Sequence, residues 1–194
     1  MFLETIAEQD ASGAVAECYR KEKEHLGFVS ESARCFTTRP DLLPMYGAFF
    51  DGVRAGFSLG AREWCLITFI AAKQLRSTYC SNVYSQRLIS LLGSKEAVLA
   101  VQRDYRNASL SAKDVEMLAY AEKIAIEAHR VTQGDIDRLR AVGFSDVEIC
   151  DIALCASFRS FISKFADAVG AAPEPAFLDQ NEAFRAAMMV GRKI

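Results

Sequence analysis

The sequence predicts an all-α protein, and three observations carry that prediction. Apolar residues recur at helical spacing along almost the whole chain, no strand-length window alternates apolar with polar residues, and stop or capping residues separate the periodic segments. With 194 residues, of which 51% are hydrophobic and 25% charged, the chain is long enough to bury a substantial core. We expect one all-helical domain over residues 1–175 and a tail over residues 176–194.

Turn residues delimit the first expected helices. A helix that starts at Ala14 ends where Gly27 provides a C-terminal stop, and a short segment follows at residues 30–36. Pro40 suits the first turn of a third helix, because proline has no amide proton to lose there, and Gly56 ends that helix.

Two central helices are expected next. The segment 59–75 is the most apolar of the chain, and the segment 78–92 follows it and stops at Gly93. A helix that is apolar on most of its faces must be surrounded by other elements. We therefore place these two segments at the centre of the core, with a shorter helix at residues 94–105 beyond them.

Capping residues define the remaining helices. Ser111 caps a helix rich in apolar residues, and Thr132 begins a brief helix that Gly143 terminates. Ser145 opens a capping box for a long helix that ends at Val169. The tail carries apolar residues on a predicted amphipathic helix that must pack on this core or on a partner: Phe184, Met188, Met189 and Val190.

Charge and hydropathy exclude several classes of protein. The net charge is −2 and no run of Lys or Arg exceeds two residues, so a nucleic-acid partner is not expected. The longest apolar stretch, residues 65–72, is far shorter than the roughly 20 residues of a membrane span. The N-terminus lacks the pattern of a signal peptide, which predicts a cytoplasmic protein whose six cysteines are free thiols.

The sequence predicts no conventional hydrolase, metal or phosphate-binding site. Residues 56–60 match the Gly-x-Ser-x-Gly pattern of hydrolases, but the flanking segments are helical and predict a helix-to-helix turn. Cys150 and Cys155 are five residues apart, and the two histidines, His25 and His129, lie without ligand spacing, so no metal is expected. No glycine-rich phosphate loop is present, and no cofactor is expected.

Two stretches carry a specific signal. Leu59-Gly60-Ala61-Arg62-Glu63-Trp64-Cys65 leads into the apolar helix, and Ser77-Thr78-Tyr79-Cys80-Ser81-Asn82-Val83-Tyr84 opens the next one. With further landmarks at residues 26–29, 39–43, 110–111, 141–146 and 161–170, the chain resembles the AhpD-like alkylhydroperoxidases of the carboxymuconolactone decarboxylase family, in their peroxidase-related branch. The resemblance covers most of residues 20–175 and implies an AhpD-like helical bundle.

The resemblance also implies the place of a redox site. Redox members of the family carry a glutamate on the first central helix and open the second with Cys-x-Tyr-Cys-x-x-x-His. Tyr79 and Cys80 match this motif, whereas Ser77 stands for its first cysteine and Tyr84 for its histidine. The glutamate position falls on Cys65 in an ungapped reading, which we favour, or on Glu63 if two residues are inserted.

These replacements change the expected chemistry. Serine cannot form the motif's disulfide, and tyrosine, with a reference pKa of about 10, is a poor base near neutral pH. Two-cysteine peroxidase turnover is therefore expected to be impaired. Ser77, Cys80 and Tyr84 still share one helix face, and Cys80 is either a packed, inert thiol or a reactive one. Cys65 lies in an apolar helix and is expected to be core.

Three hypotheses about function follow. The first is a variant antioxidant oxidoreductase, a hydroperoxide reductase in which Cys80 acts alone and an external thiol regenerates it. The second is a catalytically degenerate helical oligomer that serves as a binding module. The third is a non-redox lyase of the carboxymuconolactone decarboxylase type, against which the missing histidine counts. The resemblance implies a homo-oligomer, a dimer or a trimer of dimers, and the many wide apolar helix faces independently favour assembly.

Overall fold

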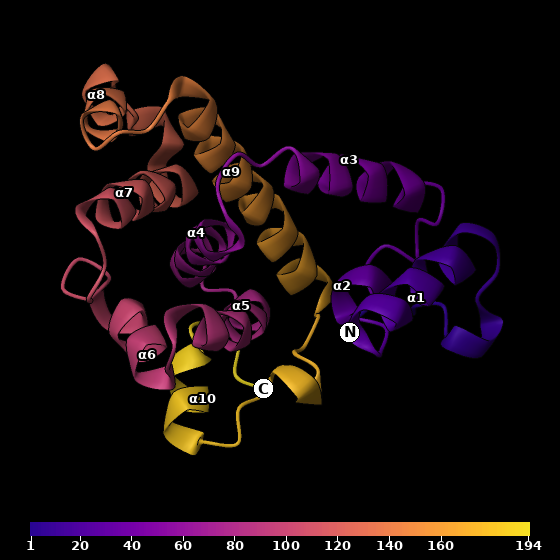
Figure 1. Cartoon of the computed structure of the whole chain (residues 1–194). Helices are drawn as coiled ribbons and strands as arrows, with labels where there is room; N and C mark the ends of the chain where they lie inside the picture. The colour runs from indigo at the N-terminus through magenta and orange to yellow at the C-terminus, as the bar shows by residue number, and fades with distance from the viewer.

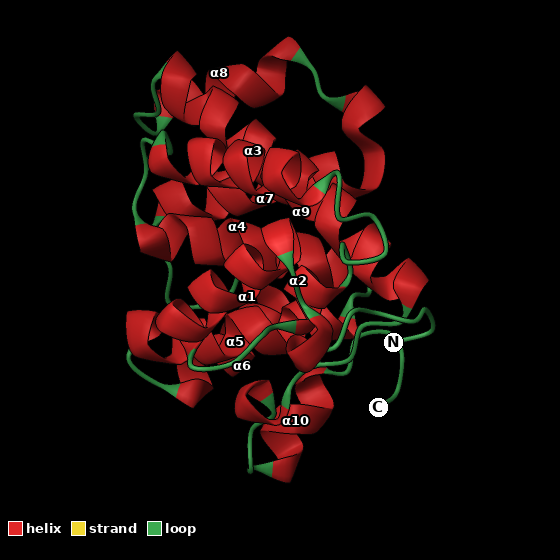
Figure 2. Cartoon of the chain, turned by 90° about the vertical axis from the view of Figure 1, so that its right-hand side faces the viewer, coloured by secondary structure: helices red, strands yellow, loops and turns green.

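Ten α-helices and three short 3-10 segments make up the regular structure of the computed structural model, which describes residues 1–194 (Figure 1). Figure 2 shows helices and loops without a strand, which confirms the predicted all-α class. The helices are α1 (Gly13–Leu26), α2 (Glu31–Arg34), α3 (Leu43–Ala55), α4 (Ala61–Gln74), α5 (Thr78–Leu92), α6 (Lys95–Asp104), α7 (Ala112–Glu127), α8 (Gln133–Ala141), α9 (Asp146–Val169) and α10 (Glu182–Met188).

Helix α4 forms the centre of the core. Every residue from Trp64 to Ala72 is buried, because α5, α7 and α9 pack around this helix on several sides. The side chains of α4 are mostly apolar, and a helix without a polar face is stable only when other elements cover it. The central placement predicted for residues 59–75 is therefore confirmed.

A tight turn joins α4 to α5 and fixes the start of α5. Arg76 adopts a left-handed conformation with φ 57°, which reverses the chain between the two helices. Ser77 then caps α5, and its hydroxyl accepts a hydrogen bond from the amide of Cys80 at 3.5 Å. This local geometry places Cys80 in the first turn of α5.

Helix α9 is the longest element and runs past the central helices (Figure 1). Its 24 residues extend about 36 Å at the usual rise of 1.5 Å per residue. The predicted capping box is present, since the Ser145 hydroxyl binds the amide of Glu148 and the Glu148 carboxylate binds the amide of Ser145. Gly170 ends the helix with φ 81°. One face of α9 therefore lies against α4 and α5.

Helix α3 begins three residues later than the sequence suggested. Pro40 lies in a turn that the amide of Leu42 closes on the carbonyl of Arg39, and Arg39 also pairs with Asp41 at 2.7 Å. These local interactions hold the segment before Leu43 outside the helix, and Pro44 takes the place in the first turn that we assigned to Pro40.

The Gly-x-Ser-x-Gly stretch is a helix-to-helix turn, as predicted. It connects α3 to α4, and the Ser58 hydroxyl donates a hydrogen bond to the Asp151 carboxylate of α9 at 2.6 Å. The serine thus fastens the turn to α9. No helix of the structure combines the length and the apolar character that crossing a membrane requires.

The C-terminal tail returns to the start of α5. Helix α10 packs against α5 and α6 and buries Phe184 and Met188, while Met189 and Val190, which we expected on this helix, lie beyond its end. The amide of Gly191 then donates to the hydroxyl of Thr78 at 3.0 Å. The approach is so close that a Cβ at this position would collide with the carbonyl oxygen of Arg76. The tail therefore covers the N-terminal end of α5.

Candidate functional site

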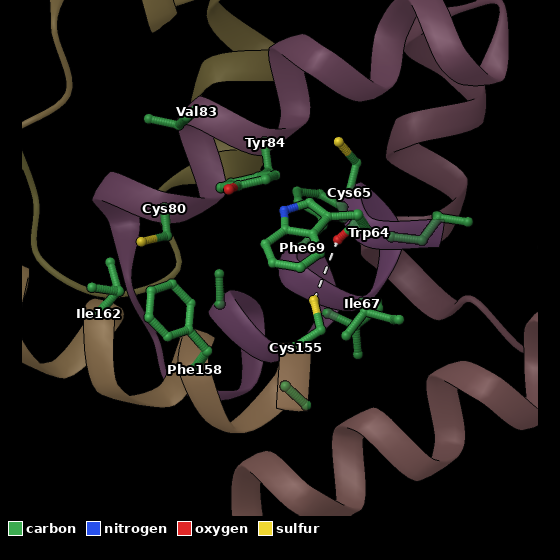
Figure 3. Close-up of a cluster of buried hydrophobic side chains, with 14 of the residues drawn as sticks. Trp64, Cys65, Ile67, Phe69, Cys80, Val83, Tyr84, Cys155, Phe158 and Ile162 are labelled. Carbon is green, nitrogen blue, oxygen red and sulfur yellow. Dashed lines mark hydrogen bonds between the residues drawn. The ribbon is translucent and has the colours of Figure 1, made fainter. Parts of the chain in front are cut away.

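Cys80 lies at the centre of the candidate site. Its side chain is 0% exposed and points from the first turn of α5 toward α9, with Phe158 and Ile162 of α9 nearby (Figure 3). A helix N-terminus favours a negative charge by about 0.3–1 kcal/mol, because unpaired amides converge there. Position alone therefore gives the thiolate form modest support.

A buried arginine provides the stronger support. The guanidinium of Arg159, on α9, donates to Cys80 Sγ at 3.6 Å and to the Tyr84 hydroxyl at 2.7 Å. Arg159 is 5% exposed and forms no ion pair with a carboxylate, and its Nε has no hydrogen-bond partner. The carbon of the guanidinium also lies 4.6 Å from the centre of the Tyr84 ring. Arg159 thus joins Cys80 to Tyr84.

Because no carboxylate pairs with Arg159, another group must balance its positive charge. Burial lowers the pKa of Arg159, but the groups beside it, Tyr84 and then Cys80, raise it by more, so the guanidinium stays protonated. A buried cation without a counter-ion costs several kcal/mol. The two groups that contact the guanidinium, Cys80 Sγ and the Tyr84 hydroxyl, are the ones placed to balance its charge.

The start of α5 lies near a second polar residue of α9. Ser77, 0% exposed, caps α5 below Cys80. The half-buried carboxyl of Asp167, on α9, lies near this end of α5. Burial raises the pKa of Asp167, while the Ser77 hydroxyl and the charge of Arg192 lower it in part. An acid therefore lies beside the serine that replaces the motif's first cysteine.

Tyr79 faces a different part of the molecule. Its hydroxyl accepts a hydrogen bond from the amide of Ser32 at 3.1 Å and donates to Glu174 at 3.4 Å. Burial raises the pKa of Tyr79 well above its usual value. Tyr79, which matches the family motif, therefore connects α2 and the segment before α10 to α5 by hydrogen bonds. It makes no hydrogen bond with Cys80.

Neither candidate for the glutamate position takes part in the polar contacts of Cys80. Glu63 closes the capping box of α4, where its carboxylate accepts from the amide of Gly60 at 3.0 Å and from Arg62 at 3.0 Å. Cys65 is buried in α4, and burial raises the pKa of its thiol. In the view of Figure 3, the Tyr84 ring lies between Cys65 and Cys80.

Of the residues that the sequence singled out, the structure brings together Ser77, Cys80 and Tyr84. Arg159, the cation that contacts Cys80, was missed. Arg159 is the single charged residue between Ile152 and Ile162, in an apolar stretch of the predicted long helix. A lone charge on an otherwise apolar helix was the signal that could have identified it.

An aromatic cavity lies beside this group of residues. Its volume is about 490 Å³, and it opens between α3 and α9. The ring of Tyr46 stacks on Phe158 with centroids 6.2 Å apart and planes inclined by 12°. Phe158 precedes Arg159 on α9. Burial raises the pKa of Tyr46, and the charge of Arg159 lowers it in part. The lining residues are Phe36, Leu42, Met45, Tyr46, Phe49, Val53, Leu154, Ser157, Phe158 and Phe161.

Similarity to known proteins is found in structure and not in sequence. No family model matches the chain, and no curated protein matches it. The fold is similar to that of an uncharacterized peroxidase-related protein with an alkylhydroperoxidase AhpD core from Ralstonia eutropha JMP134, with a TM-score of 0.76 at 21% identity over 98% of this chain and 97% of that one. A second uncharacterized peroxidase-related protein, from Silicibacter sp. TM1040, gives 0.79 at 22% identity over 89% and 93%.

The third similar structure is the debrominase Bmp8. Its TM-score is 0.76 at 18% identity, over 95% of this chain and 96% of Bmp8. Another structure of Bmp8, a cysteine-to-alanine variant, holds 2,3,4-tribromopyrrole. These comparisons confirm that the chain has the AhpD-like helical fold.

Proposed function

We propose that this AhpD-like protein is a one-cysteine thiol oxidoreductase, in which Cys80 reduces a hydroperoxide and an external thiol regenerates it. The observation that carries the proposal is the Arg159 guanidinium, 3.6 Å from Cys80 Sγ, without a carboxylate partner. Arg159 places a positive charge against Cys80 in a site where Tyr84 stands for the motif's histidine.

The reaction balances without a second protein cysteine. The Cys80 thiolate attacks the distal oxygen of the hydroperoxide, so an S–O bond forms, the O–O bond breaks and the alkoxide leaves as an alcohol after it takes a proton. One external thiol then converts the sulfenic acid to a mixed disulfide and water. A second external thiol releases the Cys80 thiol and an external disulfide. Ser77 cannot resolve the sulfenic acid, so both reducing thiols come from outside the motif.

The same geometry counts against the other hypotheses. A purely structural scaffold gains nothing from a buried cation without a carboxylate, because well-packed apolar residues in its place are often as stable or more stable. The lyase hypothesis needs a base in the site, and the two histidines lie elsewhere, His25 in α1 and His129 in the 3-10 segment after α7.

The test measures hydroperoxide consumption with dithiothreitol as the external thiol. We expect the wild type to consume cumene hydroperoxide and Cys80→Ser to lose that activity. The matched control is Cys155→Ser, which removes another buried thiol, 1% exposed, on α9. Trapping with a sulfenic-acid reagent, followed by mass spectrometry, should place the label on Cys80. Equal activity in Cys80→Ser and the wild type would refute the proposal.

A second candidate function is reductive dehalogenation of a small aromatic compound. The aromatic cavity, lined by Phe158 next to Arg159 on α9, and the similarity to Bmp8 favour it. In the net reaction an aryl bromide and two thiols give the arene, a disulfide, bromide and a proton. Bromide release from 2,3,4-tribromopyrrole, measured by ion chromatography with Cys80→Ser as control, separates this function from hydroperoxide reduction.

We further propose that two copies of the chain associate through the exposed faces of α3 and α9. Large apolar side chains are exposed there, among them Met45 at 69%, Phe49 at 58% and Phe161 at 52%. A second copy on this face would cover the cavity and separate a substrate from water. The trimer of dimers that the resemblance implies would then be built from this unit.

A further inference from the structure

Two guanidinium groups lie over the ring of Tyr84. The guanidinium carbon of Arg159 is 4.6 Å from the centre of the ring, and that of Arg87, three residues further along α5, is 5.2 Å from it. Arg159 also donates to the Tyr84 hydroxyl and to Cys80 Sγ, whereas the Arg87 side chain makes no hydrogen bond or ion pair with another residue. Two positive charges therefore lie close to the tyrosine that Arg159 connects to Cys80.

A third arginine lies over the next aromatic ring. The guanidinium carbon of Arg54, on α3, is 5.8 Å from the centre of the Trp64 ring, on α4. Figure 3 shows Trp64 and Cys65 beside Tyr84, where α4 packs on α5. Burial raises the pKa of the Cys65 thiol, and the charges of all three arginines lower it in part. We call these three side chains the arginine cluster: Arg54, Arg87 and Arg159.

No carboxylate neutralises the arginine cluster. Carboxylates are not scarce, because the chain has 25 acidic residues against 23 basic ones. Arginines elsewhere use them: Arg62 pairs with Asp114 at 2.8 Å, and Arg140 pairs with Asp146 at 2.9 Å. Like charges that are held together without a counter-ion repel each other, and a bound anion removes that repulsion. The cluster is therefore suited to an anionic ligand.

The exposure of the cluster decreases toward Cys80. Arg54 is exposed, Arg87 is half-buried and Arg159 is only 5% exposed. The innermost member also has a free donor, since Arg159 Nε has no hydrogen-bond partner. Arginine binds carboxylates well, because its planar fork can donate two parallel hydrogen bonds to them. An anion attracted by the outer arginines therefore approaches the guanidinium that contacts Cys80.

We propose that the arginine cluster binds the carboxylate of a compound that reacts with Cys80. This compound is either the hydroperoxide or the external thiol. A positive field raises the local concentration of anions and their rate of association, so a reactant with a carboxylate reaches Cys80 faster than its neutral counterpart. The inference rests on the proposed reactivity of Cys80, and it names the class of compound that the site selects.

The first test uses two alkylating reagents that differ in charge. Iodoacetate carries a carboxylate where iodoacetamide carries a neutral amide, and mass spectrometry gives the rate of each reagent at Cys80. Arg87→Gln should lower the ratio of the iodoacetate rate to the iodoacetamide rate about 3- to 10-fold. A change in the thiolate fraction of Cys80 alters both rates equally, so the ratio isolates the effect of the arginine on the charged reagent.

Three controls accompany this measurement. Arg87→Lys keeps the charge and should retain most of the wild-type ratio. Arg103→Gln changes the net charge by the same amount at an exposed position of α6 and should retain the ratio fully. Sodium chloride at about 1 M screens exposed charges and should reduce the difference between the wild type and Arg87→Gln. Thermal unfolding of each variant checks that the fold is intact.

Matched pairs of reactants then identify which compound carries the carboxylate. Linoleic acid hydroperoxide is compared with its methyl ester in the oxidation of Cys80, and thioglycolate is compared with its methyl ester in the reduction of the oxidised protein. If the hydroperoxide carries the carboxylate, Arg87→Gln lowers the ratio of the acid rate to the ester rate in the first step alone. If the thiol carries it, the ratio falls in the second step alone.

The outcomes separate this inference from the proposed function. A wild-type ratio of the two alkylation rates in Arg87→Gln overturns the anion site, even where Cys80 reduces hydroperoxides. A lowered ratio without any Cys80-dependent hydroperoxide reaction supports the anion site and refutes the proposed function. If Cys80 takes neither alkylating reagent, titration with benzoate and with benzamide decides, monitored by the fluorescence of Trp64, the single tryptophan. Tighter binding of benzoate that Arg87→Gln weakens supports the site, and equal or absent binding overturns it.

Discussion

Replacing Arg159 by methionine should separate the contributions of this residue to reactivity and to stability. A hydrogen bond to a charged group is worth about 1.5–3 kcal/mol, so losing the contact with Cys80 Sγ should slow the reaction of Cys80 at pH 7 roughly 10- to 150-fold. Arg159→Lys keeps the charge but not the planar fork that reaches Cys80 and Tyr84 together, and we expect an intermediate rate.

The expected effect of Arg159→Met on the free energy of unfolding is small, because two contributions oppose each other. Methionine fills a similar volume and removes a buried charge, which is often neutral or stabilising by about 1–4 kcal/mol. The Tyr84 hydroxyl, however, loses its donor at 2.7 Å, which costs about 1–3 kcal/mol if it stays unpaired. The free energy of unfolding of Arg159→Met should therefore stay within about 3 kcal/mol of the wild type.

Two assays check these expectations together. Urea denaturation gives the free energy of unfolding, and mass spectrometry after a short iodoacetamide pulse gives the rate at Cys80 alone. Adding Tyr84→Phe to Arg159→Met removes the unpaired hydroxyl and should recover stability without recovering the rate. A wild-type rate in Arg159→Met, or a loss of more than about 4 kcal/mol of stability, would show that Arg159 is structural and that the reasoning is wrong.

Three further predictions follow from other parts of the structure. Ser77→Cys with Tyr84→His rebuilds the family motif and should raise hydroperoxide turnover with a dithiol donor; no gain in a steady-state assay would contradict this interpretation. Phe49→Glu places a charge on the proposed interface and should shift light scattering from dimer to monomer, whereas a monomeric wild type would exclude the dimer. The hydrogen bond from Lys123 and the amide of Thr132 lower the pKa of Asp135, so its stabilising effect is present above about pH 4 and is lost as pH falls toward the folded-state pKa. Asp135→Asn should thus destabilise the protein at pH 7 in urea denaturation, with a smaller difference at pH 3; a constant difference would refute the linkage.

Much of the fold could be predicted because its signals are local. The capping box at Ser145 and the stop at Gly170 defined α9, and the predicted range of α5 agrees with the structure. Pro40 does not begin α3, because an equally local ion pair, Arg39 with Asp41, holds this proline in a turn before the helix. The predicted start of a helix was therefore wrong where one local feature favours a helix and another favours a turn.

The site could be predicted only in part. Ser77, Cys80 and Tyr84 lie on one helix, so their spacing places them on a common face. Arg159 comes 79 residues after Cys80, and no local pattern gives the register in which α9 packs on α5. Glu63 illustrates the converse: its local signal, three residues after Gly60, corresponds to a helix cap and not to chemistry.

The C-terminal cover of α5 has a consequence during synthesis of the chain. Gly191 follows its partner Thr78 by 113 residues, and Arg159 follows Cys80 by 79. At about 5–20 residues per second, roughly 6 to 23 seconds pass between translation of the first turn of α5 and translation of the segment that closes over it. A ribosome-bound chain thus carries an ordinary cysteine, without the arginine that would activate it or the tail that would shield it. Both the arginine and the tail become available only after these later segments have been made, so the environment of Cys80 is completed late in synthesis.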